Sequence, residues 1–312
     1  MRQYIFKRLV GFFVVLIGVS ILSFMLLSLS KVDPAEVIAR RGNANVTPQM
    51  IEEIRREMGL DAPMVVRYGN WVKGLFSGDV GISIYSYRPI AQDLIEYLPV
   101  TFSLVGLSLL WTVIVAVPIS IICARFKNSL ADHTIRGICI LGICMPPFWL
   151  GFLLLLGFAV KIPLFKVMPE AGIKGYLLPS VALAIPVICA VIRLFRASLL
   201  SELSTDYVQY AKARGLSPIR IFLGHVLRNA LPPIITVFCQ YLGYLIVGGA
   251  VVESVFSLKG VGSYLISCVT ASDSTAVATC IVIIAGVFVL ANLVGDIINR
   301  ILCPWMVRES NG

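Results

Sequence analysis

Six long stretches without a charged residue dominate the pattern of hydrophobic and polar positions along this chain. A helix of roughly 20 apolar residues crosses the ~30 Å hydrocarbon core of a bilayer, and backbone amides in lipid must be paired within their own segment. The pattern therefore predicts an all-α membrane protein with six transmembrane helices, the fourth being the shortest. The six stretches cover residues 9–30, 99–124, 137–160, 175–192, 229–252 and 274–295.

A polar segment of some length separates the first two stretches, at residues 31–98. Thr47 and Pro48 are typical of a helix N-cap and first turn, and Gly59 supplies a stop. A second helix is expected from Pro63 to Gly78, and a third over residues 89–97. We therefore expect a small helical insertion outside the bilayer that rests on the membrane helices.

Composition and charge agree with a membrane protein and exclude a nucleic-acid-binding one. Hydrophobic residues make up 58% of the chain and charged residues 14%. The net charge of +9 is concentrated on alternate loops: the N-terminal tail, 125–136, 193–228 and the C-terminal tail. An excess of Lys and Arg marks cytoplasmic loops, so this pattern places both termini in the cytoplasm and 31–98 on the outer side.

The resulting organisation has four parts. Residues 1–30 form a cytoplasmic tail and the first membrane helix, whose long apolar run without a cleavage pattern indicates an anchor rather than a signal peptide. Residues 31–98 form the extracytoplasmic insertion, 95–300 a five-helix core, and 301–312 a cytoplasmic tail. A cytoplasmic loop at 204–231 interrupts the core between the fourth and fifth spans.

Several chemical signatures are absent from the sequence. The eight cysteines show no Cys-x-x-Cys spacing, and histidine occurs only at His133 and His225, both in expected cytoplasmic loops. There is no Gly-x-x-x-x-Gly-Lys-Ser/Thr loop, so any ATP must be bound by another chain. No grouping of residues suggests a hydrolase. We expect no metal site, no cofactor and no enzymatic activity.

The loop between the fourth and fifth spans carries the most specific pattern. A short helix fits residues 206–214 and ends at Gly215, which can adopt the left-handed conformation. Ser217 and Pro218 then begin a helix with one apolar stripe, which we expect to end at Pro232 and Pro233 as the fifth span begins. Such an elbow could transmit a push from a soluble partner into the membrane helices.

At this loop the chain resembles the permeases of binding-protein-dependent ABC importers, in their dipeptide, oligopeptide and nickel branch. The resemblance rests on the elbow runs 210–216 (YAKARGL) and 225–232 (HVLRNALP). Further matches lie along the whole chain, at 59–63 (GLDAP), 78–83 (GDVGIS), 145–149 (MPPFW) and 248–256 (GGAVVESVF).

The resemblance implies a type I ABC importer permease fold in the bacterial cytoplasmic membrane, transporting a nickel chelate or short peptides. It implies four kinds of partner: two ABC ATPase subunits, a second homologous permease, an extracytoplasmic substrate-binding protein and membrane lipid. The short outer loop 161–174 favours a nickel-type member. The expected ATPase-coupling residues are Tyr207, Gln209, Tyr210, Ala211, Lys212, Ala213, Arg214, Gly215 and Leu216.

Residues within the spans have competing interpretations. The translocation pathway could be lined by Met145, Pro146, Pro147, Gly243, Gly248, Gly249 and Glu253. The glycines could instead serve close helix packing, and Glu253 could be a loop carboxylate just outside the lipid. Arg193 and Arg196 are expected to extend to the membrane interface.

Two functions from other classes remain open on sequence alone. A stand-alone channel or secondary transporter would act without an ATPase, and a membrane scaffold would transport nothing. Neither needs the elbow at 204–231, which is why the elbow favours the importer.

Overall fold

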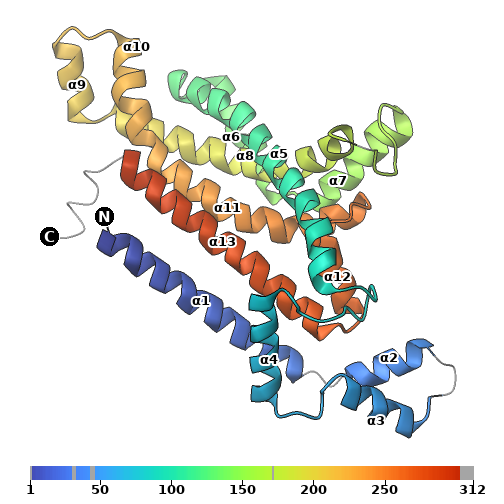
Figure 1. Cartoon of the computed structure of the whole chain (residues 1–312). Helices are drawn as coiled ribbons and strands as arrows, with labels where there is room; N and C mark the ends of the chain where they lie inside the picture. Colours follow the sequence, from blue (N-terminus) through green and yellow to red (C-terminus); the bar gives the residue numbers. More distant parts are fainter. Residues whose placement is uncertain (1, 30–32, 43–45, 171, 303–312) are drawn as a thin grey trace. The chain divides into compact units, whose positions relative to one another are not determined.

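The computed structural model describes residues 2–29, 33–42, 46–170 and 172–302, and within these ranges the chain is almost entirely helical (Figure 1). The α-helices that form or extend the membrane segments are α1 (Arg2–Ser28), α5 (Ile90–Arg125), α6 (Leu130–Cys144), α7 (Pro147–Leu155), α8 (Lys174–Leu203), α11 (Leu227–Val255) and α13 (Ser274–Leu302). The shorter α-helices are α2 (Pro34–Gly42), α3 (Pro48–Glu57), α4 (Met64–Ser77), α9 (Asp206–Ala213), α10 (Pro218–Ile221) and α12 (Val261–Thr270). Two π-helical segments, η1 (Leu156–Lys161) and η2 (Phe222–Val226), complete the described elements.

The chain divides into two compact units. The first comprises the described part of Met1–Thr101 together with Lys259–Val289, and the second comprises Phe102–Leu258 and the described residues from Leu290 onward. The helices α5 and α13 each contribute to both units.

The first unit ties the segment between α1 and α5 to membrane helices through buried polar contacts. The Trp71 indole on α4 donates to the Thr279 hydroxyl on α13 at 3.1 Å. The carboxylate of Asp273, fully buried at the start of α13, accepts from the Ser83 hydroxyl and the Ile84 amide, both at 2.7 Å. These bonds satisfy polar groups that burial would otherwise penalise. They hold the loop after α4 against α13.

The second unit is organised around α8, which packs against α6, α7 and α11. Its buried face repeats at helical spacing through Leu183, Val187, Val191, Phe195 and Leu199, all fully buried. Serine hydroxyls add contacts within the membrane region, for example Ser108 Oγ to the Ser180 carbonyl at 3.1 Å.

The predicted helices of the insertion are confirmed in part. The Thr47 hydroxyl caps α3 by accepting from the Met50 amide, and Gly59 and Gly78 end α3 and α4 in left-handed conformations with φ of 64° and 77°. The helix expected over 89–97 is present from Ile90 onward, but it is continuous with the second span as the first part of the 36-residue α5. The helix α2 and the 10-residue α12 were not predicted.

The six-span prediction needs one refinement. Five helices are long and apolar enough to cross a membrane as single segments. The third predicted span is instead two helices, Leu130–Cys144 and Pro147–Lys161, bent by 99° at Met145 and Pro146. The break falls at two successive prolines, which remove backbone donors and disfavour a continuous helix.

The expected end of the elbow helix at Pro232 and Pro233 was also wrong. Both prolines lie inside α11, and one continuous helical stretch runs from Pro218 through η2 to Val255. The Thr236 hydroxyl donates to the Pro232 carbonyl at 3.1 Å. The fifth span is therefore a direct extension of the elbow.

Candidate functional site

The elbow projects beyond the ends of α8 and α11 and consists of α9, a tight turn and α10 (Figure 1). Helix α9 ends in a Schellman motif: the Leu216 amide donates to the Ala211 carbonyl at 3.2 Å, and the Gly215 amide to the Lys212 carbonyl at 2.9 Å. This motif needs a left-handed residue at Gly215, whose φ is 78°. Pro218 then begins α10 with a preset φ.

The elbow buries one side and exposes the other. Val208 and Ala211 on α9 are buried, as are Ile221 and Val226 in the following helix. On the outside, large apolar side chains remain exposed: Tyr210 at 66%, Ile219 at 72% and Leu223 at 59%. An exposed apolar surface of this kind, edged by Lys212 and Arg214, is typical of a site for a protein partner.

Side chains connect the elbow to the end of α8. The Tyr207 hydroxyl on α9 donates to a Glu202 carboxylate oxygen at 2.6 Å. Burial raises the pKa of the Tyr207 phenol, and the bond to Glu202 adds to that rise. The Tyr207 ring also lies 6.4 Å from the His225 ring, centroid to centroid. Tyr207 therefore contacts both the end of α8 and the helix that follows α10.

The structure brings all nine predicted coupling residues together on this elbow. Six of them are exposed, and Tyr207 and Leu216 are half-buried. Ala211 is the buried one, packed beneath the helix. The exposed residues are Gln209, Tyr210, Lys212, Ala213, Arg214 and Gly215.

The seven residues suggested for a pathway lie at two places in the second unit. Met145, Pro146 and Pro147 form the bend between α6 and α7, whereas Gly243, Gly248, Gly249 and Glu253 lie along α11. Glu253 is fully buried within α11, so the interpretation that it lies in a loop was wrong. A Cβ added at Gly249 would meet Leu183 at an ordinary 3.7 Å, so close helix packing does not require a glycine there.

The glycines that do permit close helix contact were missed by sequence reasoning. A Cβ added at Gly142 on α6 would lie 2.4 Å from Cys189 Sγ on α8. One added at Gly151 on α7 would lie 2.9 Å from the Phe256 ring. Gly295 on α13 meets Cys239 Sγ on α11 at 2.4 Å in the same way. In the sequence, each of these glycines is only a small residue within an apolar run, and this pattern does not show which helix it contacts.

An ion pair between α6 and α8 was also missed. Asp132 is fully buried, and Arg196 donates to its two carboxylate oxygens at 2.6 and 2.5 Å. The Asn128 amide donates to the same carboxylate at 3.1 Å. Arg196 is therefore held by a buried carboxylate at the start of α6, whereas Arg193 is exposed.

Comparisons with known proteins cover nearly all of the chain. Residues 116–308 match the family described as binding-protein-dependent transport system inner membrane component, and residues 1–105 match its N-terminal counterpart. The chain is 33% identical over 304 residues to the glutathione transport system permease protein GsiC of Escherichia coli (strain K12), covering 97% of this chain and 98% of that protein. It is 32% identical over 312 residues to the probable peptide ABC transporter permease protein y4tP of Sinorhizobium fredii, covering 97% and 99%.

Proposed function

Since this chain belongs to the family of binding-protein-dependent transport system inner membrane components, we propose that it is the permease subunit of an ATP-driven importer of short peptides. Members of this family are ABC importer permeases and not enzymes, and the chain is a multi-pass protein of the bacterial inner membrane. The family implies ATPase and substrate-binding-protein partners. Two ATPases and a distinct, related permease are the assembly that we propose.

The exposed elbow carries this proposal. Its exposed apolar and basic side chains flank a turn whose conformation Gly215 permits. After this turn, α10 continues into the fifth span without a break. The elbow is exposed at one end and continues into a membrane helix at the other. A movement of a bound ATPase could therefore be passed to the fifth span. A channel, a secondary transporter or a scaffold would have no need of it.

Short peptides are favoured over a nickel chelate by the names of the relatives. The relatives above are named for glutathione and for peptides. Among the described residues, no group of three or more His, Cys, Asp or Glu side chains is placed to hold a metal ion. A chelate would not need such ligands, so uptake assays must include both substrates.

Photo-crosslinking tests the coupling role directly. Benzoylphenylalanine replaces Tyr210 on the elbow or, as a control, the still more exposed aromatic Phe76 on α4. The expected result is a crosslink to an ATPase subunit from position 210 and none from position 76. No ATPase adduct from position 210 in an assembled importer would contradict the coupling role.

Uptake into proteoliposomes tests the function as a whole. The full chain, assembled with its partners, should accumulate labelled dipeptide only with ATP inside, and Gly215→Arg should abolish uptake while leaving membrane insertion intact. Uptake of a nickel chelate without peptide uptake would overturn the substrate. Uptake driven by an ion gradient without any ATPase would overturn the importer itself, and undiminished uptake by Gly215→Arg would overturn the elbow's role.

A further inference from the structure

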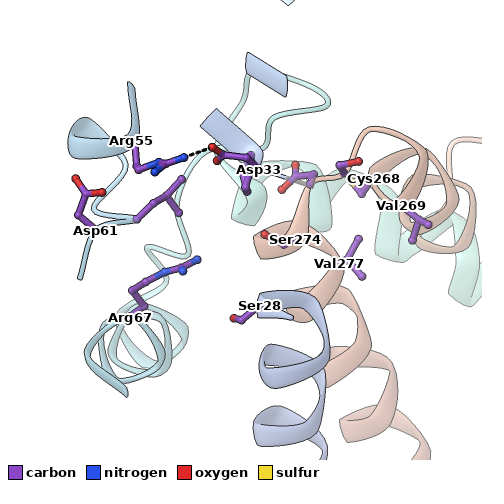
Figure 2. Close-up of a pocket in the computed structure, with 13 residues that line it drawn as sticks. Ser28, Asp33, Arg55, Asp61, Arg67, Cys268, Val269, Ser274 and Val277 are labelled. Carbon is purple, nitrogen blue, oxygen red and sulfur yellow. Dashed lines mark hydrogen bonds and ion pairs between the residues drawn. The ribbon is translucent and has the colours of Figure 1, made fainter. Parts of the chain in front are cut away.

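A polar cavity of about 550 Å³ lies in the first unit, apart from the elbow and the bend. It is enclosed by the end of α1, the insertion helices and the start of α13 (Figure 2). This volume lies within the ~300–1,000 Å³ typical of small-molecule sites. None of the proposed transport steps uses it.

The ends of two membrane helices indicate the depth of the cavity in the bilayer. Ser28 is the last residue of α1 and Ser274 the first of α13, and both line the cavity. Since α1 and α13 are both candidate membrane spans, their ends lie near the boundary between hydrocarbon and water. The cavity therefore opens at the depth of lipid headgroups.

Three hydrogen-bond donors without a polar partner face this space. Figure 2 shows the Arg67 guanidinium on α4 directed toward Ser28 and Ser274. Among the described residues, the Arg67 guanidinium forms no ion pair and no hydrogen bond, and its central carbon lies 6.0 Å from the centroid of the Phe24 ring. The Ser28 and Ser274 hydroxyls likewise make no hydrogen bond within the described part of the chain. One guanidinium with two hydroxyls is a donor set suited to a phosphate oxyanion.

The remaining charges determine which phosphate compound fits. Arg55 is paired with Asp33, and Asp273 is saturated by the bonds described above, which leaves Asp61 as a lining carboxylate without an ion pair among the described residues. Two arginines and three aspartates line the cavity, so its charges do not favour a purely anionic ligand. A ligand with an ammonium group beside its phosphate satisfies both Arg67 and Asp61.

We propose that this cavity binds the zwitterionic headgroup of an aminophospholipid from the leaflet in which α1 ends. Its phosphate lies against Arg67, Ser28 and Ser274, and its ammonium group toward Asp61. The acyl chains remain in the bilayer along α1, whose apolar side chains Leu22, Met25 and Leu26 are exposed. The site is independent of the transported substrate and of the elbow.

Native mass spectrometry of the full chain, delipidated and then titrated with phosphatidylethanolamine, tests this site. Arg67→Gln should weaken the tightest lipid-binding step about tenfold, a loss of about 1.4 kcal/mol. Arg56→Gln, an exposed arginine on α3 that does not line the cavity, is the matched control and should leave that step unchanged. Equal affinities in the two variants would overturn the proposal.

Further variants separate the chemistry of the headgroup from folding defects. Ser274→Ala removes one hydroxyl with little effect on packing and should weaken the same step by about threefold. Asp61→Asn should reduce the preference for phosphatidylethanolamine over phosphatidylglycerol, whereas Glu57→Gln, an exposed acid outside the cavity, should not. An unchanged preference in Asp61→Asn would overturn the role of the ammonium group.

A soluble ligand of the same chemistry is the competing source. Glycerophosphoethanolamine and the dipeptide Ala-Ala are the two probes, added to lipid-loaded protein. Failure of both to displace the lipid supports the lipid site. Displacement by either at a concentration below that of the lipid would assign the cavity to a soluble zwitterion and overturn the proposal.

Discussion

Two breaks in helices of the second unit, the elbow at Gly215 and the bend at Met145–Pro147, are specified in opposite ways. At the elbow the backbone decides: Gly215 has a φ of 78°, and a Cβ added there would meet nothing within 4 Å. At the bend the backbone is ordinary, with Met145 and Pro146 both in extended conformations. There the flanking helices pack closely: a Cβ added at Gly142 would lie 2.4 Å from Cys189 Sγ on α8, and one added at Gly151 would lie 2.9 Å from the Phe256 ring.

This difference separates the elbow, which exposes a surface, from helix α6, which contacts in the protein hold at both ends. Helix α6 is held at one end by the Asp132–Arg196 pair and near the other by the contact of Gly142 with Cys189. Helix α9 is held by its own turn, by Tyr207 and by the buried side chains Val208 and Ala211. Mutations near the bend should therefore affect the stability of the unit, whereas mutations at the elbow should affect uptake.

The largest effect is expected from the ion pair. Asp132→Asn leaves the Arg196 charge without its carboxylate in a largely buried position and should lower the free energy of unfolding by about 3–5 kcal/mol. Thermal unfolding of the detergent-solubilised protein, followed by loss of the folded peak on size exclusion, measures this. Arg193→Gln removes an exposed charge on the same helix and should change little. Equal stability of the two variants would show that α6 is not clamped at this end.

The next effect tests the close contact of α6 with α8. Gly142→Val places a Cβ 2.4 Å from Cys189 Sγ and should destabilise the protein by about 1–3 kcal/mol through overpacking. Gly137→Val, on the same helix, adds the same side chain where nothing lies within 4 Å. The thermal shift of the first variant should exceed that of the second. Identical shifts would mean that helix propensity, and not packing, explains the loss.

The elbow could be predicted from the sequence, whereas the bend could not. The elbow was predictable because its determinants are neighbours in the chain: Gly215 closes α9 and Pro218 opens α10. The bend was missed although Pro146 and Pro147 were noted, since prolines inside α11 and α8 produce no comparable break. Only contacts far apart in sequence distinguish these cases. Asp132 and Arg196, 64 residues apart, each resembled an ordinary loop charge until they were brought together.

A smaller effect on stability, with a larger one on uptake, is expected at the hinge of the elbow. Gly215→Ala must hold a left-handed conformation that costs roughly 1–2 kcal/mol for a residue with a Cβ. The cost is local, so the elbow should lose order while the thermal unfolding of the whole protein hardly changes. ATP-dependent uptake per assembled importer should fall severalfold. Gly224→Ala, at an exposed glycine in η2 without positive φ, is the control. A Gly215→Ala variant with full uptake would remove the distinction between the two breaks.

The smallest effect should come from the side-chain hydrogen bond between Tyr207 on the elbow and Glu202 on α8. Tyr207→Phe deletes the 2.6 Å hydrogen bond to Glu202 and keeps the ring against His225, a loss of about 1 kcal/mol or less for a half-buried pair. Because burial and Glu202 raise the pKa of the phenol above its ordinary value of about 10, Tyr207 remains a donor throughout the neutral range. The bond is present below that raised pKa and is lost only as pH rises through it. The ratio of uptake by the Phe variant to that by the unmodified protein should therefore be slightly below one and constant between about pH 6 and pH 9. A ratio that climbs to one within this range would mean that the tyrosine has already lost its proton, and that Glu202 no longer anchors the elbow.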